Sequence, residues 1–167
     1  DPCKGGPLRI DFSTTGSENE GGEITSPNYP SQYPNAVDCT WELVVDEGLG
    51  IEIHFTVFDA EDGYDFLKVW DGLSPGETKI IDLSGSNIPS PVKSYGNKMF
   101  LNFISDGDVR KGGFKLQYYY AAINCEWGDF GEWSQCTKTC GEGTQSRSRV
   151  ETQEAQHGGA ECEGSSS

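Results

Sequence analysis

The chain has 167 residues, of which 22 are glycine and 34% are hydrophobic, and its formal net charge is −15. This length allows one domain of ordinary size with a small second one, or a single larger domain. The acidic charge disfavours nucleic acid and heparin as partners and favours a cation or a basic protein surface. No apolar run approaches the length of a membrane-spanning helix, so we expect no membrane insertion in this segment.

The first 121 residues show the period-two alternation that is typical of half-buried β-strands. Apolar and polar residues alternate over 39–45, 51–57, 101–103 and 114–118. Turn-forming residues separate these segments at 26–30, 46–50, 71–72 and 112–113. No segment combines helical periodicity with capping residues. Short strands at this spacing predict an all-β fold, an antiparallel two-sheet β-sandwich.

Carboxylates cluster where two of the expected strands end. Glu61, Asp62 and Asp65 lie within five residues of one another, directly before an apolar segment, and Asp106 follows the expected strand at 101–105. If these two strand ends meet, at least three negative charges converge. Such a group binds a cation or keeps one carboxyl group protonated. A solvated acidic turn is the alternative interpretation.

Residues 72–76 match the hydrolase pattern G-x-S-x-G, which has catalytic meaning only at a strand-to-helix elbow. The following segment, 78–83, has the pattern of a strand, so we expect a hairpin turn instead. Neither histidine, His54 or His157, belongs to a metalloprotease motif, and no phosphate-binding loop is present. We therefore expect no catalytic residue in this segment.

The composition changes after Tyr120. Four of the six cysteines lie in 125–167, which has almost no aliphatic residues and must be held by disulfides and stacked side chains. We place the domain boundary after residue 121, so that the two domains are 1–121 and 122–167. The even number of cysteines predicts disulfides and an extracellular location. The competing zinc interpretation has only Cys136 and Cys140 as half a site, with no histidine at a suitable spacing.

Residues 3–120 resemble a CUB domain. The matching motifs are Cys3 with Gly5-Gly6, the run Ile24-Thr25-Ser26-Pro27-Asn28-Tyr29-Pro30-Ser31-Gln32-Tyr33-Pro34, Cys39-Thr40-Trp41, Phe58-Asp59-Ala60-Glu61, Tyr64-Asp65-Phe66-Leu67, Asp71-Gly72, Ser105-Asp106 and Gly113-Phe114. The resemblance implies a CUB-like jelly roll and a disulfide between Cys3 and Cys39. The second disulfide of the family is missing, because Asp62 or Gly63 and Ser84 stand where its cysteines are expected. Another interaction must then hold the loop at 59–65.

One subset of CUB domains binds Ca²⁺ at one end of the sandwich. The resemblance implies Glu61, Asp65 and Asp106 as ligands, with the side chain of Asp108 as a less certain one. Tyr33 would orient Glu61 without contacting the ion. Backbone carbonyls near 107–109 and water would complete the shell of ligands. Only three residues separate Glu61 from Asp65, fewer than is usual in the family. In such domains the bound carboxylates also receive a Lys or Arg from a protein partner.

Residues 125–167 resemble the start of a thrombospondin type 1 repeat, through 125–136, 137–143, 147–149 and 158–162. The resemblance implies a disulfide between Cys125 and Cys162. It also implies a stack in which aromatic rings alternate with guanidinium groups, built from Trp127, Phe130, Trp133, Arg147 and Arg149.

The family has six cysteines, whereas this segment has four. The resemblance therefore implies an incomplete module, in which the partners of Cys136 and Cys140 lie beyond Ser167. The stretch 136–141 resembles an O-fucosylation motif with Thr139 as the acceptor. Trp133 is a weaker candidate for C-mannosylation.

Together the resemblances imply an extracellular, Ca²⁺-dependent protein-binding segment that acts in adhesion, receptor or matrix assembly. One alternative is the non-catalytic, substrate-positioning tail of a secreted metalloprotease resembling astacins. Another is a purely structural matrix component.

Overall fold

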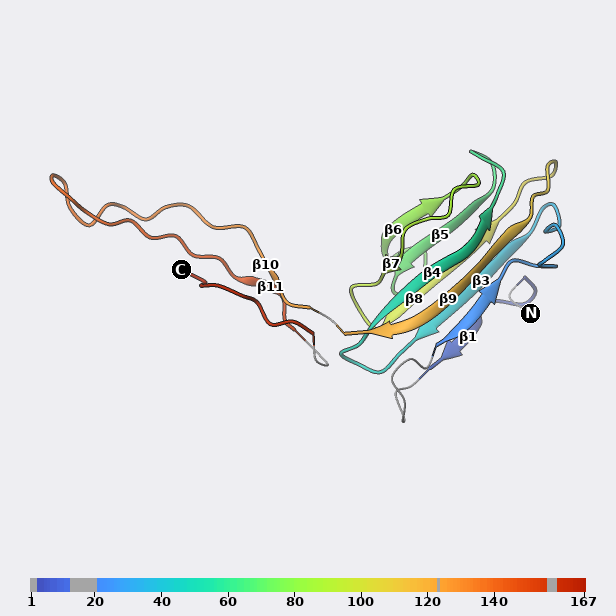
Figure 1. Ribbon diagram of the computed structural model, residues 1–167, viewed down its shortest axis with the longest axis horizontal. Helices are drawn as coiled ribbons and strands as arrows, with labels where there is room; N and C mark the ends of the chain where they lie inside the picture. The colour runs from blue at the N-terminus through green and yellow to red at the C-terminus, as the bar shows by residue number, and fades with distance from the viewer. Residues whose placement is uncertain (1–2, 13–20, 123, 156–158) are drawn as a thin grey trace. The chain divides into compact units, whose positions relative to one another are not determined.

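The computed structural model describes residues 3–12, 21–122, 124–155 and 159–167 (Figure 1). The chain forms two compact units, Asp1–Ala121 and Ala122–Ser167. No helix occurs in the described part of the chain, so none could cross a membrane. The strands of the first unit are β1 (Leu8–Asp11), β2 (Gly22–Thr25), β3 (Asp38–Val44), β4 (Gly50–Asp59), β5 (Phe66–Asp71), β6 (Thr78–Leu83), β7 (Val92–Lys93), β8 (Lys98–Ile104) and β9 (Gly113–Ala121).

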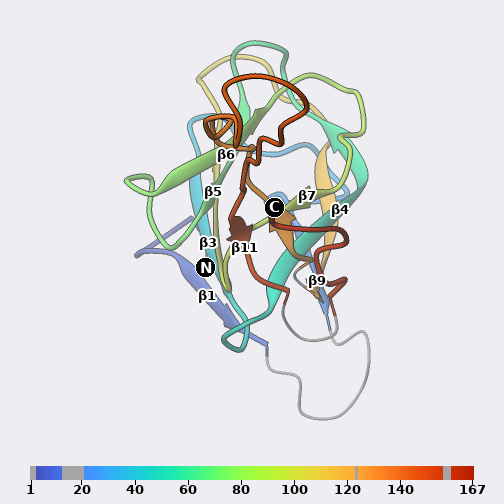
Figure 2. The same ribbon diagram turned by 90° about the vertical axis from the view of Figure 1, so that its left-hand side faces the viewer.

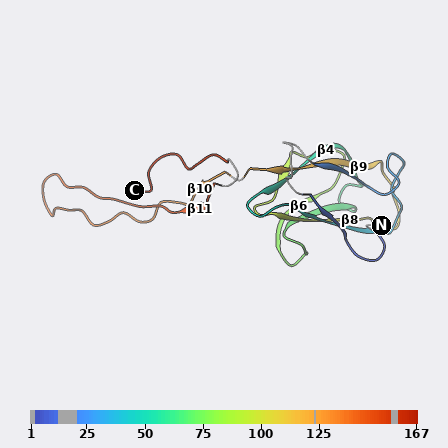
Figure 3. The same ribbon diagram turned by 90° about the horizontal axis from the view of Figure 1, so that it is seen from below.

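The first unit is a sandwich of two sheets, as expected. One sheet has the order β1-β3-β8-β5-β6 and the other has the order β2-β9-β4-β7. Figure 3 shows the layers edge-on, and Figure 2 separates β3, β5 and β6 from β4, β7 and β9. The pairing is antiparallel with one exception, because β1 pairs in parallel with β3. The chain order permits this exception, because β2 lies in the other sheet and the connection from β1 to β3 is long enough to return the chain in the same direction.

The core lies between the sheets and follows the period-two pattern. On β3, Cys39, Trp41 and Leu43 are buried, whereas the residues between them are only partly buried. The other strands of both sheets contribute large apolar side chains that include Ile51, Ile53, Leu67, Val69, Leu101, Phe103, Phe114 and Leu116. Burying these side chains is the main favourable contribution to the stability of the sandwich.

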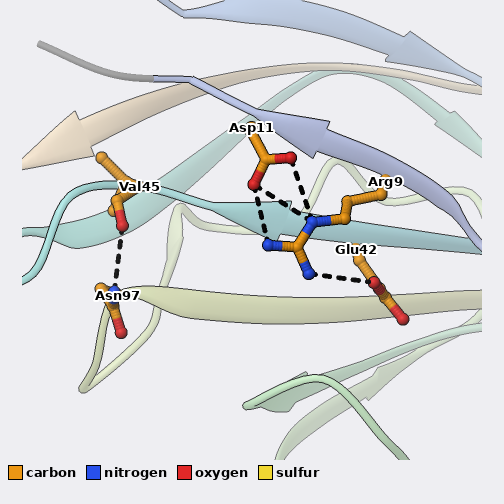
Figure 4. Close-up of polar contacts among 5 residues, drawn as sticks. All are labelled: Arg9, Asp11, Glu42, Val45 and Asn97. Carbon is orange, nitrogen blue, oxygen red and sulfur yellow. Dashed lines mark hydrogen bonds and ion pairs between the residues drawn. The ribbon is translucent and has the colours of Figure 1, made fainter.

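The edge strand β1 is attached to β3 by its parallel ladder and by a disulfide between Cys3 and Cys39. The Arg9 side chain donates to the Asp11 carboxylate and lies 3.8 Å from Glu42 of β3 (Figure 4). Arg9 and Asp11 are largely exposed, so their ion pair contributes little stability. The Asn97 side chain donates to the Val45 carbonyl and ties the start of β8 to the end of β3.

The turn between β5 and β6 contains the G-x-S-x-G pattern. The two strands pair antiparallel, and the Glu77 amide donates to the Ser74 carbonyl within the turn. Gly72 has a φ of 117°, which disfavours other residues. The expected hairpin is confirmed, and Ser74 lies on no strand-to-helix elbow.

The pairing of β5 with β8 determines which residues meet at one end of the sandwich. Phe66, the first residue of β5, pairs with Ile104, the last residue of β8. Residues that precede β5 therefore lie beside residues that follow β8. The chain that leaves β4 reaches the same end through the turn at 60–64.

The second unit contains two short strands, β10 (Glu126–Trp127) and β11 (Glu151–Gln153), which pair antiparallel. Beyond them the chain continues as two extended segments (Figure 1). The amides of Gly128, Gly131, Ser134 and Thr137 donate to the carbonyls of Val150, Ser148, Ser146 and Thr144. Three residues of one segment therefore match two residues of the other.

Five side chains form a stack along these two segments. The Arg149 guanidinium carbon lies 4.3 Å from the ring centroid of Trp127 and 4.7 Å from that of Phe130. The corresponding distances of Arg147 are 4.3 Å to Phe130 and 4.7 Å to Trp133. A disulfide joins Cys125 to Cys162. The stack and the disulfide replace the missing apolar core of this unit.

Phe130 is the ring that contacts both guanidinium groups, so Phe130→Ala should weaken the stack most. With each contact worth about 0.5–1 kcal/mol at an exposed site, we expect a loss on the order of 1–2 kcal/mol in local stability. Hydrogen exchange of the Gly128 and Gly131 amides would measure this loss. Val150→Ala, at a position that is 73% exposed, is the control. Equal exchange rates in the two variants would contradict the role of the stack.

Candidate metal centre

Three carboxylates converge at the end of the sandwich where β5 and β8 meet. Glu61, Asp65 and Asp106 each offer a carboxylate oxygen, and these oxygens lie within 4.8 Å of one another. Asp65 is fully buried, whereas Glu61 and Asp106 are partly buried. Glu61 comes from the turn after β4, Asp65 directly precedes β5, and Asp106 follows β8. The residues expected as the main ligands are therefore brought together.

The short separation between Glu61 and Asp65 does not keep their carboxylates apart. The Asp65 amide donates to the Glu61 carbonyl over 3.0 Å, and the Tyr64 amide donates to the same oxygen over 3.3 Å. These bonds close a single tight turn, in which Gly63 has a φ of 78°. The turn places both side chains at one site, so the loop is long enough to form the cluster.

Asp65 is held by two donors. The Tyr33 hydroxyl donates to Asp65 Oδ2 over 2.5 Å, and the Asp106 amide donates to Asp65 Oδ1 over 2.8 Å. Burial, and then the hydrogen bond to Asp65, raise the pKa of Tyr33 well above its ordinary value, so its hydroxyl stays a donor. The role of Tyr33 differs in detail from the expected one. Its hydroxyl accepts a hydrogen bond from the Glu61 amide and donates one to the Asp65 carboxylate. It orients the Glu61 carboxylate only through the backbone.

Glu61 carries the observation that points most clearly to a cation ligand. Its Oε2 atom is buried and has no hydrogen-bond partner among the described residues. Burial raises the pKa of Glu61, and the charges of Asp106 and Asp65 raise it further. A buried carboxylate oxygen without a partner is costly. A hard divalent cation such as Ca²⁺ satisfies several carboxylates at once, so the residues present fit this ion.

The loop after β8 is fixed by residues that the sequence interpretation did not identify. Asn35 Nδ2 donates to the carbonyls of Gly107 and Asp108 over 2.6 and 2.9 Å. The carbonyls expected to complete the metal shell thus already accept one hydrogen bond each. The Asp108 amide donates to Asp106 Oδ1, but the Asp108 carboxylate is not one of the three that converge. Asn35 follows Tyr33-Pro34, and this position alone did not indicate its contacts.

The loop at 59–65 has hydrogen bonds where the second disulfide of the family is missing. Ser84 Oγ accepts a hydrogen bond from the Gly63 amide over 2.8 Å and donates one to the Glu61 carbonyl over 2.9 Å. The Ala60 amide donates to the Gly85 carbonyl. A serine hydroxyl therefore connects the segments that a disulfide would have joined.

A second group of possible ligands lies in the other unit and consists of Cys125, Glu151 and Cys162. Its two sulfur atoms form a disulfide, so they offer no thiolate to a metal ion. The remaining candidate site residues of this unit, those for glycosylation and the two unpaired cysteines, are exposed. Thr139 and Trp133 are accessible for modification, and Cys136 and Cys140 are exposed free cysteines.

The sequence profile of the CUB domain matches residues 13–118, and that of the thrombospondin type 1 domain matches residues 128–167. Tolloid-like protein 2 of Mus musculus is 34% identical over 127 residues, which cover 73% of this chain and 12% of that protein. Bone morphogenetic protein 1 of Xenopus laevis is 34% identical over 129 residues, which cover 74% of this chain and 18% of that protein. The chain thus spans only 12–18% of these relatives.

Two solved structures share the fold. The full extracellular region of zebrafish Gpr126/Adgrg6 superimposes with a TM-score of 0.57 at 28% identity, covering 70% of this chain and 15% of that one. The CUB2 domain of MASP-1, solved bound to Ca²⁺, superimposes with a TM-score of 0.52 at 27% identity, covering 65% of this chain and 96% of that one.

The raised pKa of Glu61 predicts how the metal-free protein responds to loss of this charge. The folded state favours protonated Glu61. The stability that protonated Glu61 contributes is therefore lost as the pH rises from 4.5, the ordinary pKa of a glutamate, through the raised pKa of Glu61. At pH 7 and with a chelator present, Glu61→Gln should therefore raise the melting temperature. Asp62→Asn is the matched control, because it removes the same charge from an exposed neighbour. Equal melting temperatures for both variants would contradict charge repulsion at Glu61.

Proposed function

Because this chain belongs to the CUB domain family and continues into a thrombospondin type 1 domain, we propose that it binds extracellular proteins in a Ca²⁺-dependent manner. Both domains are non-catalytic, so this segment is not an enzyme. It is an extracellular protein-interaction segment, as its family and relatives indicate. The metal dependence and the chemistry of the partner are the proposed part.

The observation that carries the calcium proposal is the buried, unpartnered oxygen of Glu61 between two further carboxylates. Glu61, Asp65 and Asp106 would hold the ion, and Asp108, backbone carbonyls and water are available for the six to eight oxygen ligands that Ca²⁺ takes. The bound ion would neutralise the repulsion among the carboxylates. The Ca²⁺-bound CUB2 domain of MASP-1, which has the same fold, supports this proposal.

The proposed partner is a protein that presents a Lys or Arg side chain. When the ion fixes the two loops, the carboxylate lone pairs that do not face it can accept charge-assisted hydrogen bonds from an ammonium or guanidinium group. A net charge of −15 also favours encounter with a basic surface. The biological setting would be adhesion, receptor or matrix assembly. Fucose on Thr139 and mannose on Trp133 belong to the same proposal and would appear as added mass in the secreted protein.

A second candidate function is the non-catalytic, substrate-positioning tail of an astacin-like metalloprotease. The similarity to Tolloid-like protein 2 and bone morphogenetic protein 1 favours it, because the matched regions are short parts of much longer proteins. A zinc-protease motif in the same polypeptide, upstream of Asp1, would select this candidate.

Titration calorimetry with CaCl₂ tests whether the metal centre binds Ca²⁺. The Asp106→Ala variant tests the role of the metal centre in partner binding. We expect one Ca²⁺ site and a higher melting temperature with Ca²⁺. The absence of both effects at millimolar Ca²⁺ would exclude the site.

Proteins captured from conditioned medium by the immobilised chain should be released by EDTA and should not bind Asp106→Ala, because EDTA removes the ion and the substitution removes one of its ligands. Asp62→Asn should capture the same proteins as the wild type. Undiminished capture by Asp106→Ala would refute the role of the metal centre in partner binding, even if calorimetry detects Ca²⁺.

A further inference from the structure

The turn that carries Glu61 has little apolar packing of its own. Asp62, Gly63 and Tyr64 are exposed, and a Cβ atom added to Gly63 would meet no atom within 4 Å. Ala60 is the buried apolar residue at the start of this turn. The conformation of the turn must therefore depend on polar contacts from other segments.

Ser84 makes two of these contacts with one side-chain oxygen. Its hydroxyl donates to the Glu61 carbonyl and accepts from the Gly63 amide, so it bridges the middle of the turn from a segment more than 20 residues away. The Glu61 carbonyl also accepts the two amides that close the turn. The position of Ser84 thus sets the backbone of the residue whose carboxylate is buried without a partner.

We propose that Ser84 is a positioning residue of the metal centre, an inference that rests on the proposed calcium function. Its hydroxyl holds the turn in the metal-free protein in the conformation that presents the Glu61 carboxylate to Asp65 and Asp106. Without the hydroxyl, the turn is less ordered in the metal-free protein and must become ordered when the ion binds. The entropic cost of this ordering then weakens the measured Ca²⁺ affinity by the same free energy. Ser84 contacts only backbone atoms of the turn and acts through Glu61.

The test uses the full 167-residue chain and CaCl₂ as the only ligand. Ser84→Val and Ser84→Thr have the same shape and differ in the hydroxyl group. We expect about tenfold weaker Ca²⁺ binding for Ser84→Val and Ser84→Ala, and close to wild-type binding for Ser84→Thr. Ser86→Ala, at an exposed serine of the same segment, is the control and should bind as the wild type does.

The outcomes separate the two proposals. A wild-type chain that binds no Ca²⁺ overturns the proposed function and this inference together. Wild-type binding with equal affinity in Ser84→Val and Ser84→Thr overturns the positioning role alone, even if both variants melt at a lower temperature.

Hydrogen exchange in the wild type gives a measurement that does not depend on how the variants fold. The Gly63 amide should exchange slowly without Ca²⁺, because it already donates to Ser84. Fast exchange that slows only when Ca²⁺ is added would also overturn the inference.

Discussion

The register of β5 against β8 is the constraint on which the acidic end of this molecule depends. Leu67 pairs with Phe103 and Val69 with Leu101, and all four side chains are fully buried between the sheets. A shift by one residue would turn these side chains toward solvent, so the hydrophobic core fixes the register. The same register places Asp65 beside Asp106, whose amide donates to the Asp65 carboxylate. The core therefore determines the geometry of the polar site at its end.

The acidic end stores unfavourable electrostatic energy that the rest of the sandwich offsets. Asp65 is compensated by a hydroxyl and an amide donor, whereas Glu61 keeps one buried oxygen without a partner among the described residues. A cation would remove this imbalance, and its binding would stabilise the folded sandwich relative to the unfolded chain. A site of this kind links the stability of the fold to the concentration of the cation.

The sandwich could be predicted from the sequence because its strands alternate strictly, as in 39–45 and 51–57. The parallel pairing of β1 could not, because the alternation of Leu8–Asp11 indicates a strand but neither its partner nor its direction. Of the candidate site, Glu61, Asp65 and Asp106 could be proposed from motifs and strand ends.

The contacts of Tyr33, Asn35 and Ser84 could not be predicted. Each joins segments that are 20 or more residues apart, and a single polar residue in a loop leaves no periodic signal. Sequence reasoning assigned Tyr33 to Glu61 by analogy, but only the folded geometry distinguishes a bond to its backbone from one to its carboxylate. Strand ends are thus visible in the sequence, whereas the contacts that brace them depend on the tertiary fold.

The three-to-two register of the second unit limits how this segment can change in length during evolution. Each hydrogen-bonded step advances three residues along 128–137 and two residues along 144–150. An insertion or deletion of one residue on either side would move every later ring away from its guanidinium group. A neutral change in length must therefore remove or add three residues on one segment and two on the other. Substitutions can accumulate singly here, but insertions and deletions have to arise as matched pairs.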